Sequence, residues 1–240
     1  KEYKQSVITE AVTRGLDPSA PLKGSGVEWI GKIPENFNIR KLKSICKIFG
    51  RIGFRGYRQD DLVEEGEGAI TISPSNMRDA KMDYSKCTYL SWGKYYESPE
   101  IQIKKGDILF VKTGSTYGKI ALVSDLPMEA TINPQLVVLK NFNAHNSYLC
   151  YFLQTYHIQS QVKITVVGGT IPTIAQDKIS RYDVIVPPLE EQQQIADYLD
   201  KKCAEIDKLI SIKQQKIETL TEYKKSLIYE YVTGKKEVVS

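Results

Sequence analysis

The feature that most constrains this fold is a helical pattern that starts after Pro187-Pro188 and continues almost to the end of the chain. Glu190-Glu191 places negative charge in the first turn, where a helix dipole favours it, and Gly234 is a suitable stop. We therefore predict one long helix over 189–234, followed by a tail at 235–240. Apolar side chains recur along it in alternating three- and four-residue steps. They are Leu199, Cys203, Ile206, Ile210, Ile217, Leu220, Leu227 and Tyr231, with Lys213 and Lys224 interrupting the series.

A narrow apolar seam on an otherwise polar helix needs a partner. At roughly 1.5 Å per residue this helix is about 65 Å long. It could fold back onto its own domain, but an antiparallel coiled coil with a second helix of the same kind fits the pattern better. The residues predicted at the helix-pairing interface are Leu199, Ile206, Ile210, Ile217, Leu220, Leu227 and Tyr231.

The sequence at the start of the chain recurs, with few changes, near its end. With an offset of 220 residues, the segments 2–13 and 222–233 are identical at Glu2/Glu222, Tyr3/Tyr223, Lys4/Lys224, Ser6/Ser226, Ile8/Ile228, Glu10/Glu230, Val12/Val232 and Thr13/Thr233. Such self-similarity marks a repeated structural unit. We therefore expect residues 1–14 to be the end of a preceding long helix, and the chain to be one half of a two-repeat protein. The first residue is Lys and not Met, which agrees with this expectation.

The amino-acid composition limits the classes of protein to which this chain can belong. The chain is 41% hydrophobic and 26% charged, which is typical of a soluble globular protein, and its apolar runs are too short for a membrane span. The four cysteines lie far apart, which favours buried thiols in the reducing cytoplasm over disulfides or zinc. His145 and His157 have no acidic or cysteine residue at ligand spacing, so no metal site is expected. The net charge of +4 is modest.

Between the two helical segments, residues 15–188 have the pattern of an α+β domain. After a connector rich in Pro, Gly and Ser, short β-type runs alternate with turn residues. We predict a largely antiparallel sheet and one helix over 145–162. The expected strands are Ala69–Ser73, Ile101–Ile103, Asp107–Lys112, Lys119–Ser124, Gln135–Leu139 and Tyr182–Val186.

Two segments resemble catalytic loops without matching them. "VKTGSTYGKI" resembles a phosphate-binding loop, but it has three residues between its glycines instead of four, and Ile120 follows the Lys. It is either a plain β-turn or a loop whose Lys, Thr and Tyr side chains meet nucleic acid. "NPQL" at 133–136 resembles the base-holding loop of adenine methyltransferases, but it lacks the second Pro and the aromatic residue. Its expected role is the start of a strand, and no catalytic residue is predicted.

Three further segments carry side chains suited to DNA. "FGRIGFRGYRQ" (49–59) interleaves arginines with Phe54 and Tyr57, and its glycines let the backbone come close to a ligand. "SPSNMR" (73–78) offers Asn76 and Arg78, and "VVGGTIPTIAQDKI" (166–179) offers a glycine turn. Each also has a plain interpretation, as a solvated basic loop or a simple connector.

Together these segments resemble the DNA-specificity (S) subunits of Type I restriction-modification systems. The resemblance rests on "GVEWIGKIPENF" (26–37), "GDILFVKTGS" (106–115), "GGTIPTIAQDKI" (168–179), "VPPLEEQQQIADYLD" (186–200), the helix 206–235 and the repeated opening. It covers nearly the whole chain. The segment after Val186 carries it most specifically, because target recognition domains vary with the DNA that they read.

The resemblance implies a function for each part of the chain. A target recognition domain at 15–188 would read one half of a bipartite DNA site, and the long helices would act as a spacer. The helices would dock methyltransferase subunits, which supply the S-adenosylmethionine, and restriction subunits would join them. With one recognition domain, this cytoplasmic chain would form a homodimer that recreates the two-domain arrangement, or it would remain half-competent.

The expected role is therefore non-catalytic DNA recognition, and the alternative is a coiled-coil adaptor or a nucleic-acid-binding protein without sequence readout. The residues predicted to contact DNA are Arg51, Arg55, Tyr57, Arg58, Asn76, Arg78, Lys112, Thr113, Ser115, Thr116, Tyr117, Lys119 and Thr170.

Overall fold

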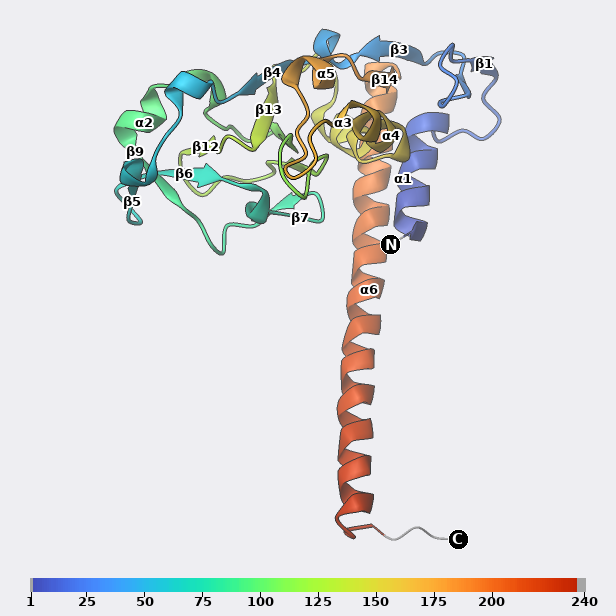
Figure 1. Ribbon diagram of the computed structural model, residues 1–240. Coiled ribbons are helices and arrows are strands. Elements are labelled where there is room, and N and C mark those ends of the chain that lie inside the picture. Colours follow the sequence, from blue (N-terminus) through green and yellow to red (C-terminus); the bar gives the residue numbers. More distant parts are fainter. Residues whose placement is uncertain (1, 237–240) are drawn as a thin grey trace. The chain divides into compact units, whose positions relative to one another are not determined.

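The computed structural model describes residues 2–236, with the side chain of Phe54 outside the described part. One compact unit extends to Ala196, and a second begins at Asp197. The helices are α1 (Glu2–Arg14), α2 (Trp92–Tyr96), α3 (Asn146–Leu153), α4 (Tyr156–Thr165), α5 (Gln176–Ser180) and α6 (Leu189–Val232). The strands are β1 (Leu22–Gly24), β2 (Lys32–Pro34), β3 (Asn38–Lys41), β4 (Lys47–Gly50), β5 (Leu62–Val63), β6 (Gly68–Ile72), β7 (Met77–Arg78), β8 (Lys81–Met82), β9 (Tyr89–Ser91), β10 (Ile108–Val111), β11 (Ile120–Leu122), β12 (Ala130–Ile132), β13 (Leu136–Lys140) and β14 (Asp183–Val186) (Figure 1).

The first compact unit is built on an antiparallel sheet in the order β11-β10-β13-β4. Strand β10 is buried along its whole length, because both faces of this sheet are covered. Leu109 and Val111 point into the main apolar cluster, while Phe110 points the other way and packs near Tyr182, with ring centroids 6.5 Å apart. This two-sided burial explains why the strand is a continuous apolar run without polar alternation.

A second sheet, in the order β12-β6-β9-β5, supplies the other half of the apolar cluster. Ile70 and Ile72 of β6 and Ile132 of β12 meet Leu136 and Val138 of the first sheet there. The pair β12–β6 is parallel and the other pairs of this sheet are antiparallel. The predicted α+β class with a largely antiparallel sheet is confirmed.

Two predicted elements differ from the structure. The expected strand Ile101–Ile103 is a 3-10 turn at Pro99–Ile101 followed by a single β-bridge at Gln102. The expected helix 145–162 is two helices, because α3 ends at Leu153 and the Thr155 hydroxyl bonds to the carbonyl of Phe152 instead of continuing the helix. Tyr156, the first residue of α4, is exposed.

Helix α1 is the observed form of the segment predicted as the end of a preceding helix, and Lys1 lies outside the described residues. It packs on α3 and β2 and buries Ile8 and Val12. The buried hydroxyl of Tyr148, on α3, has two backbone acceptors for its hydrogen bond. The carbonyl oxygen of Ile185 lies 3.0 Å from it and that of Val12 lies 3.2 Å from it. Burial also raises the pKa of this tyrosine well above its usual value. Tyr148 therefore ties α1 to the domain through backbone atoms.

This tie gives a stability prediction. Tyr148→Phe should lower the free energy of unfolding by about 1–2 kcal/mol, because buried carbonyl groups lose their donor. Urea denaturation measures the change, and Tyr156→Phe is the matched control because that ring is exposed. Equal midpoints for the two variants would contradict the assigned role of the Tyr148 hydroxyl.

Helix α6 begins within the first compact unit and ends in a glycine cap. Near its start, the buried Gln192 accepts a hydrogen bond from the amide of His145 (2.8 Å) and donates one to the carbonyl of Pro187 (2.8 Å). At its end, Gly234 has φ +70°, and the amide of Lys235 bonds to the carbonyl of Glu230 (2.8 Å). Together with the bond from the amide of Gly234 to the carbonyl of Tyr231 (3.3 Å), this bond forms a Schellman cap, which agrees with the predicted stop at Gly234. Of the predicted tail, residues 237–240 lie outside the described part.

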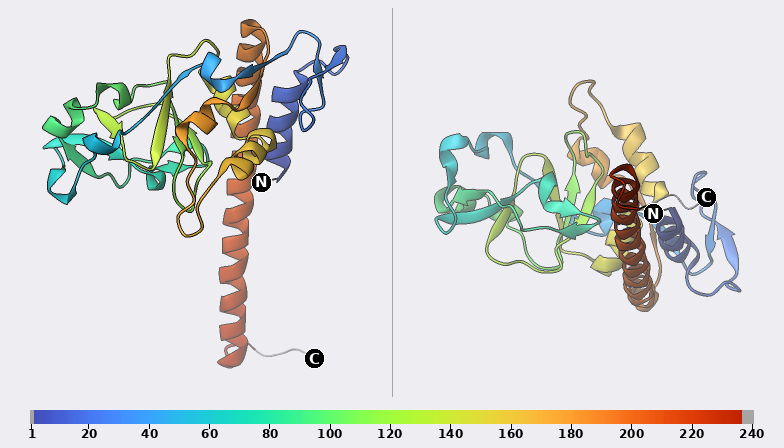
Figure 2. Two further views of the ribbon diagram at one scale, coloured as in Figure 1. Left: turned by 45° about the horizontal axis from the view of Figure 1, so that its top comes forward. Right: turned by 90° about the horizontal axis from the view of Figure 1, so that it is seen from below.

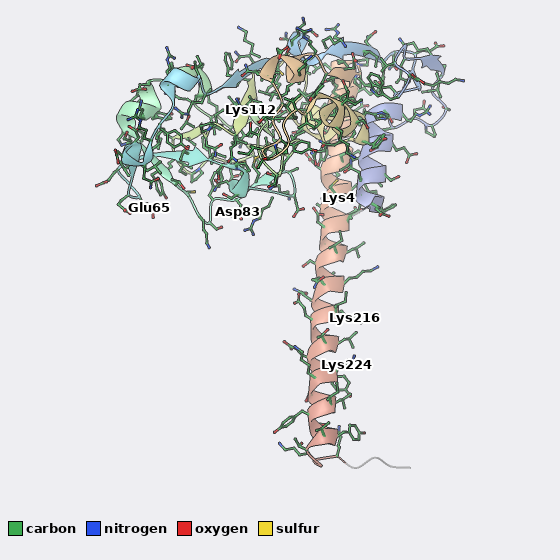
Figure 3. The ribbon with its side chains drawn as sticks, viewed as in Figure 1. Lys4, Glu65, Asp83, Lys112, Lys216 and Lys224 are labelled. Atoms are coloured by element: carbon green, nitrogen blue, oxygen red, sulfur yellow. The ribbon has the colours of Figure 1, made fainter. Side chains whose placement is uncertain are left out.

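The seam of α6 divides into a buried start and an exposed remainder. Leu199 and Cys203 are buried, and Ile206 and Leu227 are half-buried. The remaining predicted pairing residues, Ile210, Ile217, Leu220 and Tyr231, are 41–57% exposed. Side chains project on both sides of the helix around Lys216 and Lys224 (Figure 3). Among the described residues, no helix combines the length and apolar character that crossing a bilayer demands.

Candidate nucleic-acid interface

Several loops lie at the same end of the strands in the two sheets. The parallel strands β6 and β12 both end there, with Ile132 paired to Ile72. The register of the first sheet brings the end of β10 and the end of β4 to the start of β13. The loops that follow or precede these strands must therefore gather. Segment 166–174, which joins α4 to α5, lies beside them. We call these segments together the loop edge, and they are 51–58, 73–76, 112–119, 133–135 and 166–174.

Backbone hydrogen bonds join three of these segments. The amides of Lys112 and Thr113 donate to the carbonyl of Gln135 (2.8 and 3.2 Å), and the amide of Gly114 donates to the carbonyl of Pro172 (2.9 Å). Thr113 and Thr173 form an isolated β-bridge. The connection between α4 and α5, which carries residues 166–174, projects from the domain in both views of Figure 2. Segments that lie far apart in the sequence thus form one surface.

The glycine loop 114–118 is a turn that uses several of its own amides in backbone hydrogen bonds. The amide of Tyr117 donates to the carbonyl of Gly114 (3.1 Å), that of Gly118 to Val111 (2.8 Å) and that of Lys119 to Thr116 (3.2 Å). A phosphate-binding loop would instead present several amides to its ligand. The amides of Tyr117, Gly118 and Lys119 are therefore engaged within the turn and do not form the cradle of a phosphate-binding loop.

Arg51 occupies a different position from the one expected of a DNA contact. Its side chain is buried, and it donates to the carbonyl of Ile132 (3.2 Å), the hydroxyl of Thr131 (3.1 Å) and the carbonyl of Arg55 (3.3 Å). It also lies 5.1 Å from the ring centre of Tyr57. Burial lowers the pKa of its guanidinium. The structure therefore gives Arg51 the role of fastening loop 51–58 to the end of β12.

Asn76 is likewise buried. Its side-chain oxygen accepts from the amide of Ser73 (3.0 Å), and its amide group donates to the carbonyls of Asp83 (3.2 Å) and Lys86 (2.8 Å). A side chain with these partners shapes the turn after β6 and has no group left to offer adenine. Both Arg51 and Asn76 were expected to contact DNA on residue type alone, and residue type does not report burial.

Two other predicted arginines are paired with carboxylates. Arg55 lies 3.4 Å from Glu100, and the exposed Arg78 lies 3.0 Å from Asp83 in the hairpin β7–β8. The pKa of the Asp83 carboxyl is lowered, first by hydrogen bonds from Ser85 and to a smaller extent by Arg78. Surface pairs of this kind contribute little stability, so a phosphate could replace the carboxylate at small cost.

The remaining predicted residues share accessible positions on the loop edge. The exposed ones are Arg58, Ser115, Thr116 and Thr170, and the half-buried ones are Tyr57, Lys112, Thr113, Tyr117 and Lys119. The ammonium group of Lys119 donates to the carbonyl of Pro74 (3.2 Å), which joins the turn after β6 to the glycine loop. This surface offers hydroxyls, two tyrosine rings and cations, the groups that contact phosphates and base edges.

Sequence reasoning missed two features. Lys43 and Lys47 line a shallow groove of about 450 Å³ beside β4, together with Gln176 of α5. The signal was present, because residues 40–47 hold four basic residues and no acidic one. Gln135 was missed as well, although its carbonyl holds the glycine loop and its side chain accepts a bond from Asn133 (3.1 Å). Among residues 2–236, no group of three or more His, Cys, Asp or Glu side chains is placed to hold a metal ion.

Comparison with known proteins identifies the family. Residues 34–222 match the model of the Type I restriction modification DNA specificity domain. The specificity subunit of the Type I restriction enzyme MjaVIII from Methanocaldococcus jannaschii is 24% identical over 237 residues, covering 97% of this chain and 53% of the relative. The EcoKI specificity subunit from Escherichia coli is 22% identical over 219 residues, covering 85% of this chain and 44% of the relative. This chain therefore spans about half the length of these curated relatives.

Solved structures share the fold. The HsdS subunit from Thermoanaerobacter tengcongensis superposes with a TM-score of 0.61 at 18% identity, covering 88% of this chain and 45% of that one. A chain from work on complex assembly and conformational transition of the type I R-M system gives a TM-score of 0.69 at 18% identity, covering 95% and 52%. The family model covers most of the chain, and the fold agrees. The chain therefore belongs to the family of the Type I restriction modification DNA specificity domain.

Proposed function

We propose that this chain is a sequence-specific DNA-recognition component of a Type I restriction-modification enzyme and reads one half of a bipartite target. The observation that carries the proposal is the convergence of five chain segments at the loop edge of the two sheets. Arg58 and Tyr117 are suited to base edges, while Lys43, Lys47 and Lys119 are suited to the flanking phosphates. Arg51 and Asn76 hold the loops in position.

Helix α6 serves as the spacer and the assembly element in this proposal. Its exposed seam pairs antiparallel with the helix of a second copy, so two recognition domains stand at opposite ends of a homodimer. The paired helices dock the methyltransferase subunits, which bring S-adenosylmethionine, and the restriction subunit joins that complex. The chain itself performs no catalysis and acts on DNA in the cytoplasm.

Single substitutions test the readout. The target is first selected from a random duplex pool with the complex of this chain and its methyltransferase subunit. Arg58→Ala should then lose about 1–3 kcal/mol of affinity at one base pair of the target. Lys119→Ala should weaken target and scrambled duplexes alike and lower the salt slope by about one. Fluorescence anisotropy at several salt concentrations measures both effects, and Lys23→Ala, on β1, is the control.

The same titrations separate the alternatives. Equal losses on target and scrambled DNA for every loop variant would contradict sequence readout and leave a non-specific nucleic-acid-binding protein. Retention of full affinity by all loop variants would place the contact elsewhere. Absence of DNA binding by a complex that still assembles would favour a coiled-coil adaptor.

A further inference from the structure

The repeated segment occurs in two different environments. In α1, Ile8 is 3% exposed and Val12 is fully buried. Their counterparts at the far end of α6, Ile228 and Val232, are 54% and 79% exposed. Lys4 and Lys224, another two counterparts in the repeat, are labelled in Figure 3. The same apolar pattern is therefore covered once and left bare once in this chain.

The covered copy shows which surface fits the pattern. Helix α1 lies on α3 and β2, and we call the surface that it contacts the receptor face. Two polar bonds fix it there, from the Tyr148 hydroxyl to the carbonyl of Val12 and from the side-chain amide of Gln5 to the carbonyl of Gln154 (2.9 Å). The first needs only a backbone carbonyl, and the second needs only a donor.

The exposed copy of the segment at the far end of α6, which we call the bare copy, can meet both requirements. Lys225 replaces Gln5 and carries a donor, and every residue offers the backbone carbonyl. Thr13 and Thr233 already form the same local bond, each hydroxyl donating to the carbonyl four residues earlier at 2.7 Å. Two positions differ in size, because Tyr229 and Tyr231 stand where α1 has Thr9 and Ala11. The bare copy therefore fits the receptor face less closely than α1 does.

We propose that the last turns of α6 from a second copy of this chain bind the receptor face and displace α1 from it. One face cannot hold two helices, so α1 is a tethered competitor for the site. Its release is the step that completes a two-copy assembly. This inference rests on the proposed antiparallel pairing of α6, which brings the end of each helix to the domain of the other copy.

Cross-linking in the full chain tests the displacement. In a background with the four native cysteines replaced by Ala, Gln154→Cys and Lys225→Cys are combined and treated with a short bismaleimide. We expect a covalent dimer, which denaturing gels separate from the monomer. Adding Ile8→Ala and Val12→Ala should raise its yield by about tenfold or more, because removing buried aliphatic groups weakens the docking of α1. Gln154→Cys with Lys216→Cys is the control pair, and it should not cross-link.

Further variants sharpen the test. Tyr231→Ala should increase the cross-link, because it restores the small residue of α1, and Ile228→Ala should decrease it. Tyr3→Ala, on the exposed side of α1, should leave it unchanged. An excess of a peptide of residues 2–14 should suppress the cross-link by refilling the receptor face.

Light scattering distinguishes the two ways of failing. A dimer without the Gln154–Lys225 cross-link, also after Ile8→Ala and Val12→Ala, overturns the displacement and leaves the proposed pairing intact. A monomer at all concentrations overturns both the pairing and the displacement. A cross-link that is insensitive to the α1 substitutions and to the peptide overturns the competition.

Discussion

Replacing Ile210 and Ile217 together by Asp should convert the proposed homodimer into a monomer and abolish binding of the methyltransferase subunit. Both side chains are exposed in the single chain, at 41% and 57%, so the substitutions leave the packing of the first compact unit intact. In a paired seam they would bury two uncompensated carboxylates, which costs far more than the pairing provides. Light scattering gives the mass, and co-purification reports the methyltransferase subunit.

The matched control places the same charges off the seam. Ser211→Asp with Gln215→Asp adds two carboxylates to the same turns of α6, on positions outside the heptad series. This variant should keep the dimer mass and the partner. A double Ile variant that retains the wild-type mass would contradict helix pairing, and loss of assembly in both variants would point to charge instead of the seam.

Arg51→Met should lower the free energy of unfolding by about 3 kcal/mol and loosen the loop edge. The substitution keeps apolar bulk but removes three donors, and it leaves buried acceptors on Thr131 and Ile132 without them. Urea denaturation measures the stability, and DNA affinity should fall for all sequences because loop 51–58 loses its anchor.

Two comparisons identify the cause of that loss. Arg58→Ala should leave the urea midpoint unchanged, since that side chain is exposed. Arg51→Lys should recover only part of the stability, because an ammonium group cannot bridge the three acceptors that a guanidinium reaches. If Arg51→Met lost affinity for one base pair at unchanged stability, Arg51 would be a direct reader and not an anchor.

The long helix and the sheet class could be predicted from the sequence because both depend on local periodicity. The heptad steps and the Gly234 stop define α6 within a few residues, and continuous apolar runs locate β10 and β13. The break between α3 and α4 could not be found this way. It depends on a Thr155 side chain that bonds to the backbone, and the apolar spacing continues across it.

The sequence identified segments that the structure brings together at the loop edge, but it did not show which of their side chains are accessible. The segments 112–119 and 166–174 were identified by their glycines. Their side-by-side placement depends on long-range backbone bonds, such as the bridge between Thr113 and Thr173, which local pattern does not encode. Arg51 and Arg58 look alike in the sequence, yet one is an interior anchor and the other is exposed. That difference depends on contacts with Thr131 and Ile132, some eighty residues away.

Three segments of the loop edge are joined by main-chain hydrogen bonds, and this affects which substitutions the proposed DNA interface can accept. Main-chain groups form the bonds that join segment 112–119 to Gln135 and Pro172, so these bonds do not depend on which side chains the loops carry. Positions 115–117 and 170 can therefore be exchanged freely while the scaffold persists. In the proposed DNA interface, a few substitutions at these positions would then change the preferred sequence without a new fold.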